Sequence, residues 1–80
     1  MSDHLKKLHT ILSKVLGVNA DSIDDAMSPD TVPNWDSYNA LMLVSELETG
    51  FKVHFTMDEV MAVKNVGDIK ASLRKHGLTL

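Results

Sequence analysis

The stretch PNWDSYNALMLVSELETGF, residues 33–51, carries the clearest structural signal in this sequence of 80 residues. Asp36 is a favourable N-cap residue, so a helix is predicted to begin there, with Ser37 in its first turn. The helix is predicted to run to about Thr49. Gly50 is expected to end it, because glycine commonly follows the last turn of a helix.

This central helix is apolar on more than one face. One stripe, assigned to the core, contains Leu43, Val44, Leu47 and Phe51. Leu41, Met42 and Ser45 lie towards the other side. A helix with this pattern is either buried all round or exposes a contact surface. Met42 is expected to be exposed there, as an adaptable contact for a partner.

The region before this helix is predicted to hold an amphipathic helix and a long loop. Residues 3–16 repeat apolar side chains at spacings of three and four, with Ser2 as N-cap and Gly17 as the stop. Residues 17 to about 35 contain two prolines and several Asp and Asn, which indicates a connection without regular structure. Loops of this length are usually functional. The side chains expected to hold it to the core are Ile23, Met27 and Val32.

Two more helices are predicted after the central one. Thr56 and Glu59 match the capping-box pattern, which predicts a short helix over 57–62. A last helix is predicted over about 66–76. The chain is therefore expected to form one all-α domain over residues 1–80. It would be a small bundle of three main helices and one short helix, with the long loop between the first and second.

Composition and charge argue against several classes of protein. The chain has no cysteine, which excludes a disulfide framework and a thiolate metal site. The net charge is -3, and no Lys or Arg occurs between Lys14 and Lys52. This acidic middle argues against nucleic-acid binding and favours partners with basic surfaces. The longest apolar run, Ala40–Val44, is too short to insert into a membrane. The N-terminus has no apolar region behind a basic start, so a cytoplasmic protein is expected. A monomer is expected from the small size of the chain.

The segment Trp35-Asp36-Ser37-Tyr38 carries the candidate chemistry. Ser37 lies where unpaired backbone N–H groups and the positive end of the helix dipole favour an anion. A phosphodiester on its hydroxyl would suit this position. An Asp–Ser pair is also a common plain helix start, so the pair alone does not decide the function. Trp35 is expected to pack the loop against the bundle.

From Asp36 to Ile69 the chain resembles the acyl carrier protein family. That family has an Asp-Ser-Leu attachment motif, a helix, an aromatic residue with alternating apolar positions, a short helix and a Val-Gly-Asp turn. The matching residues here are Asp36-Ser37-Tyr38, Leu43, Val44, Leu47, Glu48, Phe51, Val53, Phe55, Asp58-Glu59 and Val66-Gly67-Asp68. They fit the family pattern without a gap.

The resemblance implies a carrier and not an enzyme. A phosphopantetheinyl transferase would attach 4'-phosphopantetheine to Ser37, with Asp36 helping to position magnesium and coenzyme A. The thiol of this cofactor would hold an acyl or aminoacyl group as a thioester. A ligase would load that group, and a downstream transferase or synthase would receive it. The second helix would be the main recognition surface, with interface residues Tyr38, Leu41, Met42, Ser45 and Glu48, and the third helix would shape access to the cargo.

Departures from the family pattern narrow the choice of pathway. Tyr38 stands where the family usually has Leu, and Asn39 and Met42 stand where general fatty-acid carriers are densely acidic. A less charged, more apolar face suggests partners selected by shape and buried contact. Trp35 before the motif makes the chain similar to specialised stand-alone carriers. Examples are D-alanyl carriers and carriers of secondary-metabolite or polysaccharide biosynthesis.

Other functions have less support in the sequence. His4 and His9 are five residues apart, whereas two metal ligands on one helical face need a spacing of three or four. The histidines are therefore expected to be solvated, with no metal site. A serine hydrolase needs a base near Ser37, and no His lies nearby in sequence. One alternative stays open: an unmodified interaction domain of the same fold that works through Leu41, Met42 and Ser45.

Overall fold

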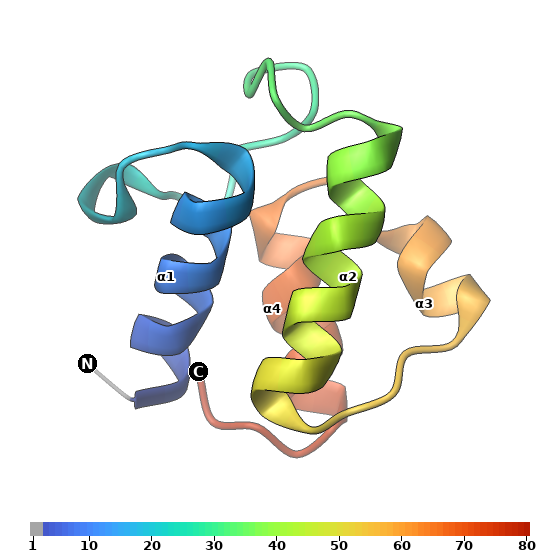
Figure 1. Ribbon diagram of the computed structural model, residues 1–80. Coiled ribbons are helices and arrows are strands. Elements are labelled where there is room, and N and C mark those ends of the chain that lie inside the picture. Colours follow the sequence, from blue (N-terminus) through green and yellow to red (C-terminus); the bar gives the residue numbers. More distant parts are fainter. Residues whose placement is uncertain (1–2) are drawn as a thin grey trace.

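The computed structural model describes residues 3–80, which form four α-helices and one short 3-10 turn (Figure 1). The elements are α1 (Asp3–Leu16), η1 (Ala20–Ser22), α2 (Ser37–Phe51), α3 (Met57–Ala62) and α4 (Val66–Lys75). The described residues contain no strand, and the predicted all-α fold is confirmed. Ser2, the predicted N-cap of α1, lies outside the described residues. Within residues 3–80, no helix combines the length and the apolar character needed to cross a membrane.

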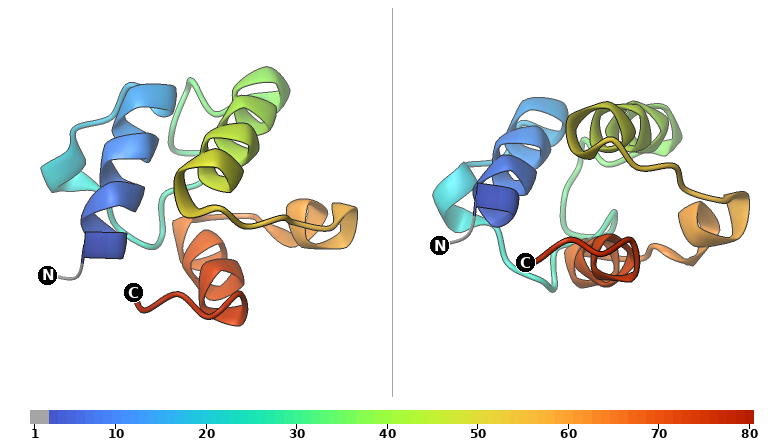
Figure 2. Two further views of the ribbon diagram at one scale, coloured as in Figure 1. Left: turned by 60° about the horizontal axis from the view of Figure 1, so that its bottom comes forward. Right: turned by 90° about the horizontal axis from the view of Figure 1, so that it is seen from below.

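Three helices, α1, α2 and α4, surround one hydrophobic core. The short helix α3 lies beside α2 and α4, on the side away from α1 (Figure 2). The buried core residues are Leu8, Leu12, Leu16, Val32, Trp35, Leu43, Leu47, Phe51, Val66, Ile69 and Leu73. The stripe predicted on α2 is buried at Leu43, Leu47 and Phe51, whereas Val44 is half-buried. The core therefore draws on every main helix and on the end of the long loop.

The predicted end of α2 at Gly50 is wrong. The helix continues to Phe51 and ends where Lys52 takes a left-handed conformation with φ of 56°. Gly50 instead lies against α1: a Cβ atom there would be 3.1 Å from the Ile11 Cδ1 atom. Its carbonyl also accepts a hydrogen bond of 2.6 Å from Lys7 Nζ. Gly50 is thus used for close helix packing and not as a helix stop.

The long loop is attached to the start of α4 through its backbone. The N–H groups of Val66 and Gly67 donate to the carbonyls of Met27 and Asp25, at 2.9 and 3.0 Å. Lys70 adds an ion pair of 2.5 Å with the Asp25 carboxylate. The first N–H groups of a helix have no partner within the helix, so the loop stabilises α4 while α4 fixes the loop.

The side chains predicted to hold this loop also pack against the core. Val32 is buried, and Ile23 and Met27 are half-buried against the core cluster. The loop is not wholly irregular, because it contains η1, and Thr31 and Val32 donate to the Ser28 carbonyl in a turn. Residues 17–36 are therefore an ordered connection that sets where α2 begins.

Gly50→Leu is expected to lower the free energy of unfolding by about 1–3 kcal/mol, because the new side chain must displace Ile11 from a filled contact. Thr49→Leu places the same side chain at the neighbouring exposed position and should change this free energy by less than about 0.5 kcal/mol. Urea unfolding followed by circular dichroism gives both values. Equal values for the two variants would contradict a packing role for Gly50.

Candidate functional site

The start of α2 places Ser37 on the surface with its hydrogen-bonding groups available. Asp36 is the N-cap: its Oδ1 atom accepts the N–H of Asn39 at 2.8 Å. Ser37 is exposed, and its hydroxyl makes no hydrogen bond with any described residue. The backbone N–H groups of Ser37 and Tyr38 also have no partner among residues 3–80. An anion attached to Ser37 therefore meets free donors and the positive end of the helix dipole.

The residues just before Ser37 are held by two asparagine side chains. Asn39 Nδ2 donates to the carbonyl of Asn34 at 2.6 Å, and Asn34 Nδ2 donates to the carbonyl of Leu16 at 3.1 Å. Trp35 is only 6% exposed and packs into the core, as expected for its side chain. Asn34 was not among the predicted site residues. The one signal in the sequence was Asn39, an amide at a position where general fatty-acid carriers are expected to be acidic.

Four of the five predicted interface residues share an outer face of α2. Tyr38 is 70% exposed and Leu41 67% exposed, and Met42 and Ser45 are also exposed. Their spacing of three and four residues places them side by side on the helix. Glu48 differs, because its carboxylate accepts the backbone N–H of Phe55 at 2.8 Å. The structure thus groups four of these side chains and turns the fifth towards the connection between α2 and α3.

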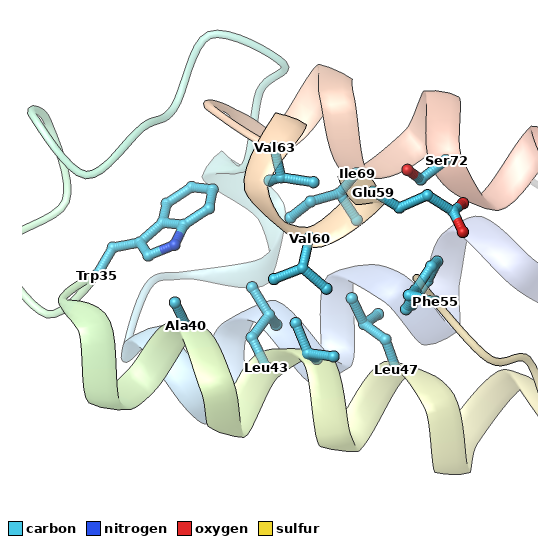
Figure 3. A pocket seen from close by; sticks show the side chains of 11 residues that line it. Trp35, Ala40, Leu43, Leu47, Phe55, Glu59, Val60, Val63, Ile69 and Ser72 are labelled. Carbon is cyan, nitrogen blue, oxygen red and sulfur yellow. The ribbon is translucent and has the colours of Figure 1, made fainter. Parts of the chain in front are cut away.

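A mainly apolar cavity of about 70 Å³ lies between α2, α3 and α4 (Figure 3). Trp35 lies at the end nearest the start of α2, and Phe55, Ser72 and the carboxylate of Glu59 lie at the other end. The remaining lining side chains are Ala40, Leu43, Val44, Leu47, Val60, Val63 and Ile69. A site of this shape suits a short apolar group and leaves α3 as one wall.

At the far end of this cavity, Glu59 of α3 contacts His76, the residue that follows α4. Glu59 completes the predicted capping box with Thr56, and its other oxygen lies 2.8 Å from His76 Nε2. The backbone N–H of Thr56, followed by the His76 side chain, lowers the pKa of Glu59 below its ordinary value of 4.5. His76 is therefore not a solvated histidine, contrary to the expectation. No group of three or more potential metal ligands occurs in the part of the chain that the structure describes.

Comparison with solved structures identifies the fold of this chain. No protein-family model matches the sequence, and the search of curated proteins gave no match. Among solved structures, the chain is similar to "a putative acyl carrier protein" from Mycobacterium tuberculosis, with a TM-score of 0.80. The chain has the acyl carrier protein fold. The match covers 90% of this chain and 96% of that chain at 19% identity, so it establishes the fold and leaves the role of Ser37 as a prediction.

The Glu59 carboxylate is expected to make stability depend on acid pH. Its folded-state pKa lies below 4.5, so its contribution is fully present above that pH and is lost as the pH falls through the folded-state pKa. Wild-type protein should therefore lose stability between about pH 5 and about pH 3 more steeply than Glu59→Gln. Melting temperatures measured across this range test it. Parallel curves for the two proteins would show that the Glu59 contacts do not hold α3 in place.

Proposed function

We propose that this chain is a carrier protein that holds an acyl or aminoacyl group on a 4'-phosphopantetheine arm attached to Ser37. The observation that carries the proposal is the exposed Ser37 hydroxyl, free of internal hydrogen bonds, at the first position of α2 in an acyl carrier fold. The thiol of the arm supplies the thioester chemistry when the group is attached. The chain itself supplies attachment, presentation and shelter, and it is not an enzyme.

The groups around Ser37 fit a phosphodiester and the metal that accompanies its transfer. The unpaired N–H groups of Ser37 and Tyr38 lie next to the position that the phosphate oxygens would take. Asp36 uses Oδ1 for the N–H of Asn39, which leaves Oδ2 without a partner in the described residues. That oxygen is the hard ligand that magnesium prefers, so Asp36 can serve both as the helix cap and in the transferase complex.

The cavity between α2, α3 and α4 supports a small cargo. Its wall next to Trp35 is the part closest to the start of α2 (Figure 3). A volume of about 70 Å³ is room for a few water-sized groups, so a short acyl or aminoacyl chain fits better than a long one. This supports a specialised stand-alone carrier, of the D-alanyl or secondary-metabolite kind, over a general fatty-acid carrier.

The partners of such a carrier would dock on the outer face of α2. We propose that a phosphopantetheinyl transferase, a loading ligase and a downstream transferase or synthase contact Tyr38, Leu41, Met42 and Ser45. Glu48 would contact these partners through its Oε1 atom, because its Oε2 atom accepts the backbone N–H of Phe55. The carrier would work as a cytoplasmic monomer, without nucleic acid or membrane insertion.

Incubation with coenzyme A and a broad-specificity phosphopantetheinyl transferase is expected to add one phosphopantetheinyl group to the wild-type protein. Ser37→Ala should gain nothing, because the accepting hydroxyl is absent. Thr49→Ala, which removes another exposed hydroxyl from the same helix, should be modified like the wild type. Intact-mass spectrometry reads all three results.

Two outcomes would count against the carrier. A folded wild-type protein without a mass gain would favour an unmodified interaction domain of the same fold. A mass gain that persists in Ser37→Ala would place the attachment elsewhere. Independently of these mass measurements, unchanged cellular activity of Ser37→Ala would also reject the proposal.

Leu41→Ala is expected to lower kcat/KM for the transferase by roughly tenfold, the effect of losing one anchoring side chain at an interface. The melting temperature should hardly change, because Leu41 is mostly exposed in the free protein. Thr49→Ala truncates an exposed residue at the other end of α2 and should leave kcat/KM unchanged. Equal rates for Leu41→Ala and wild type would remove Leu41 from the docking face for this partner.

A further inference from the structure

The side chain of Asn39 makes a bond that an acidic residue cannot make. Its Nδ2 atom lies 2.6 Å from the carbonyl oxygen of Asn34, and an amide nitrogen is required there because two oxygens would repel each other. Asn39 is half-buried, so this amide is not simply a solvated surface group. The departure from an acidic residue at this position therefore has a physical cause within the chain.

Asn34 extends the same contact to the end of α1. Its own Nδ2 atom donates to the carbonyl of Leu16, one of the last carbonyls of α1, which have no partner within the helix. The next residue, Gly17, has φ of +69°, and a Cβ atom there would lie 3.1 Å from Asn34 Nδ2. Glycine at position 17 both adopts the left-handed conformation and leaves space for the Asn34 amide.

The Asn34 carbonyl is the centre of this arrangement, because it accepts two donors. Besides Asn39 Nδ2, it accepts the backbone N–H of Asp36 at 3.0 Å. Asp36 in turn accepts the backbone N–H of Asn39 at 2.8 Å. We call these four residues, Leu16, Asn34, Asp36 and Asn39, the asparagine bridge. It joins the end of α1 to the start of α2 across the last residues of the loop, and Ser37 lies inside it in sequence.

We propose that Asn34 and Asn39 are positioning residues that hold Ser37 in the one orientation that a phosphopantetheinyl transferase accepts. This inference rests on the proposed carrier function. Neither side chain reacts. Asn39 holds the Asn34 carbonyl, which also accepts the Asp36 N–H, and Asn34 ties this segment to the end of α1. The backbone that carries Ser37 therefore leaves the loop in a set direction, without ordering at the moment of binding.

Loss of a positioning residue is expected to change the transferase kinetics, whereas loss of a residue that only stabilises the fold is not. Without the bridge, the backbone before Ser37 samples several orientations, and only a fraction of the protein is competent to bind. The apparent KM rises by the inverse of that fraction, whereas kcat stays the same once the competent form is bound. A residue that only stabilises the fold leaves both constants unchanged below the melting temperature.

The experiment measures transferase kinetics with coenzyme A on Asn34→Ala, Asn39→Ala and the double variant. Each single variant should raise KM for the carrier roughly fivefold, the value of one hydrogen bond, with unchanged kcat. The double variant should be no worse than the worse single variant, because both act through one bridge. Asn39→Asp should be worse than Asn39→Ala, because its carboxylate faces the Asn34 carbonyl.

Control variants distinguish positioning by the asparagine bridge from direct contact of Asn34 and Asn39 with the transferase. Asn19→Ala removes another capping asparagine, which binds the Asp21 N–H far from Ser37 in sequence, and it should not change KM. If the effects of Asn34→Ala and Asn39→Ala multiply in the double variant, each contacts the transferase directly and the bridge is overturned. If KM stays at the wild-type value, the inference fails while the carrier function stands. If the wild type is not modified at all, the carrier function fails and the inference fails with it.

Discussion

The position of Ser37 depends on one backbone contact, the docking of the long loop on the first turn of α4. The N–H groups of Val66 and Gly67 need external partners, and the carbonyls of Met27 and Asp25 supply them. Asp24 accepts the N–H groups of Ala26 and Met27, which fixes the turn that presents those carbonyls. A chain of 20 residues between two helices would otherwise have great conformational freedom. Tied at its middle to α4, it reaches α2 with a defined direction.

The packing of α1 against α2 is the second constraint, because a domain of 80 residues has a thin margin of stability. Gly50 brings the two helices together at one end, and Lys7 joins them through the Gly50 carbonyl and through its position 5.6 Å above the Phe51 ring. At the other end, the asparagine bridge joins the last turn of α1 to the first turn of α2. The two contacts hold the Ser37 end of α2 and its Gly50 end to the same neighbour, α1.

Local signals in the sequence located the helices, and tertiary contacts account for what they missed. The capping residues Asp36, Thr56 and Glu59 act within three residues of themselves, so the starts of α2 and α3 were predictable. Gly50 was wrongly predicted to end α2, because the residue that it packs against, Ile11, is 39 positions away in the sequence. The same limit hid the bond from Asn34 to Leu16, whose partners are separated by 18 positions. The motif predicts Ser37 as the attachment site, whereas the asparagine contacts before it are visible only in the fold.

The outer face of α2 shows what the proposed carrier, with its low charge, would use to select partners. Both acids of this helix are engaged within the chain: Glu46 pairs with Lys14 at 2.7 Å, and Glu48 accepts the N–H of Phe55. The amide of Asn39 is also used internally. What α2 leaves for partners is therefore the exposed apolar group of Tyr38, Leu41 and Met42. Contacts of this kind gain affinity by desolvation and shape, and long-range attraction contributes little to them. In the proposed function, an adaptable methionine within the group would let one face fit successive enzymes of different shape.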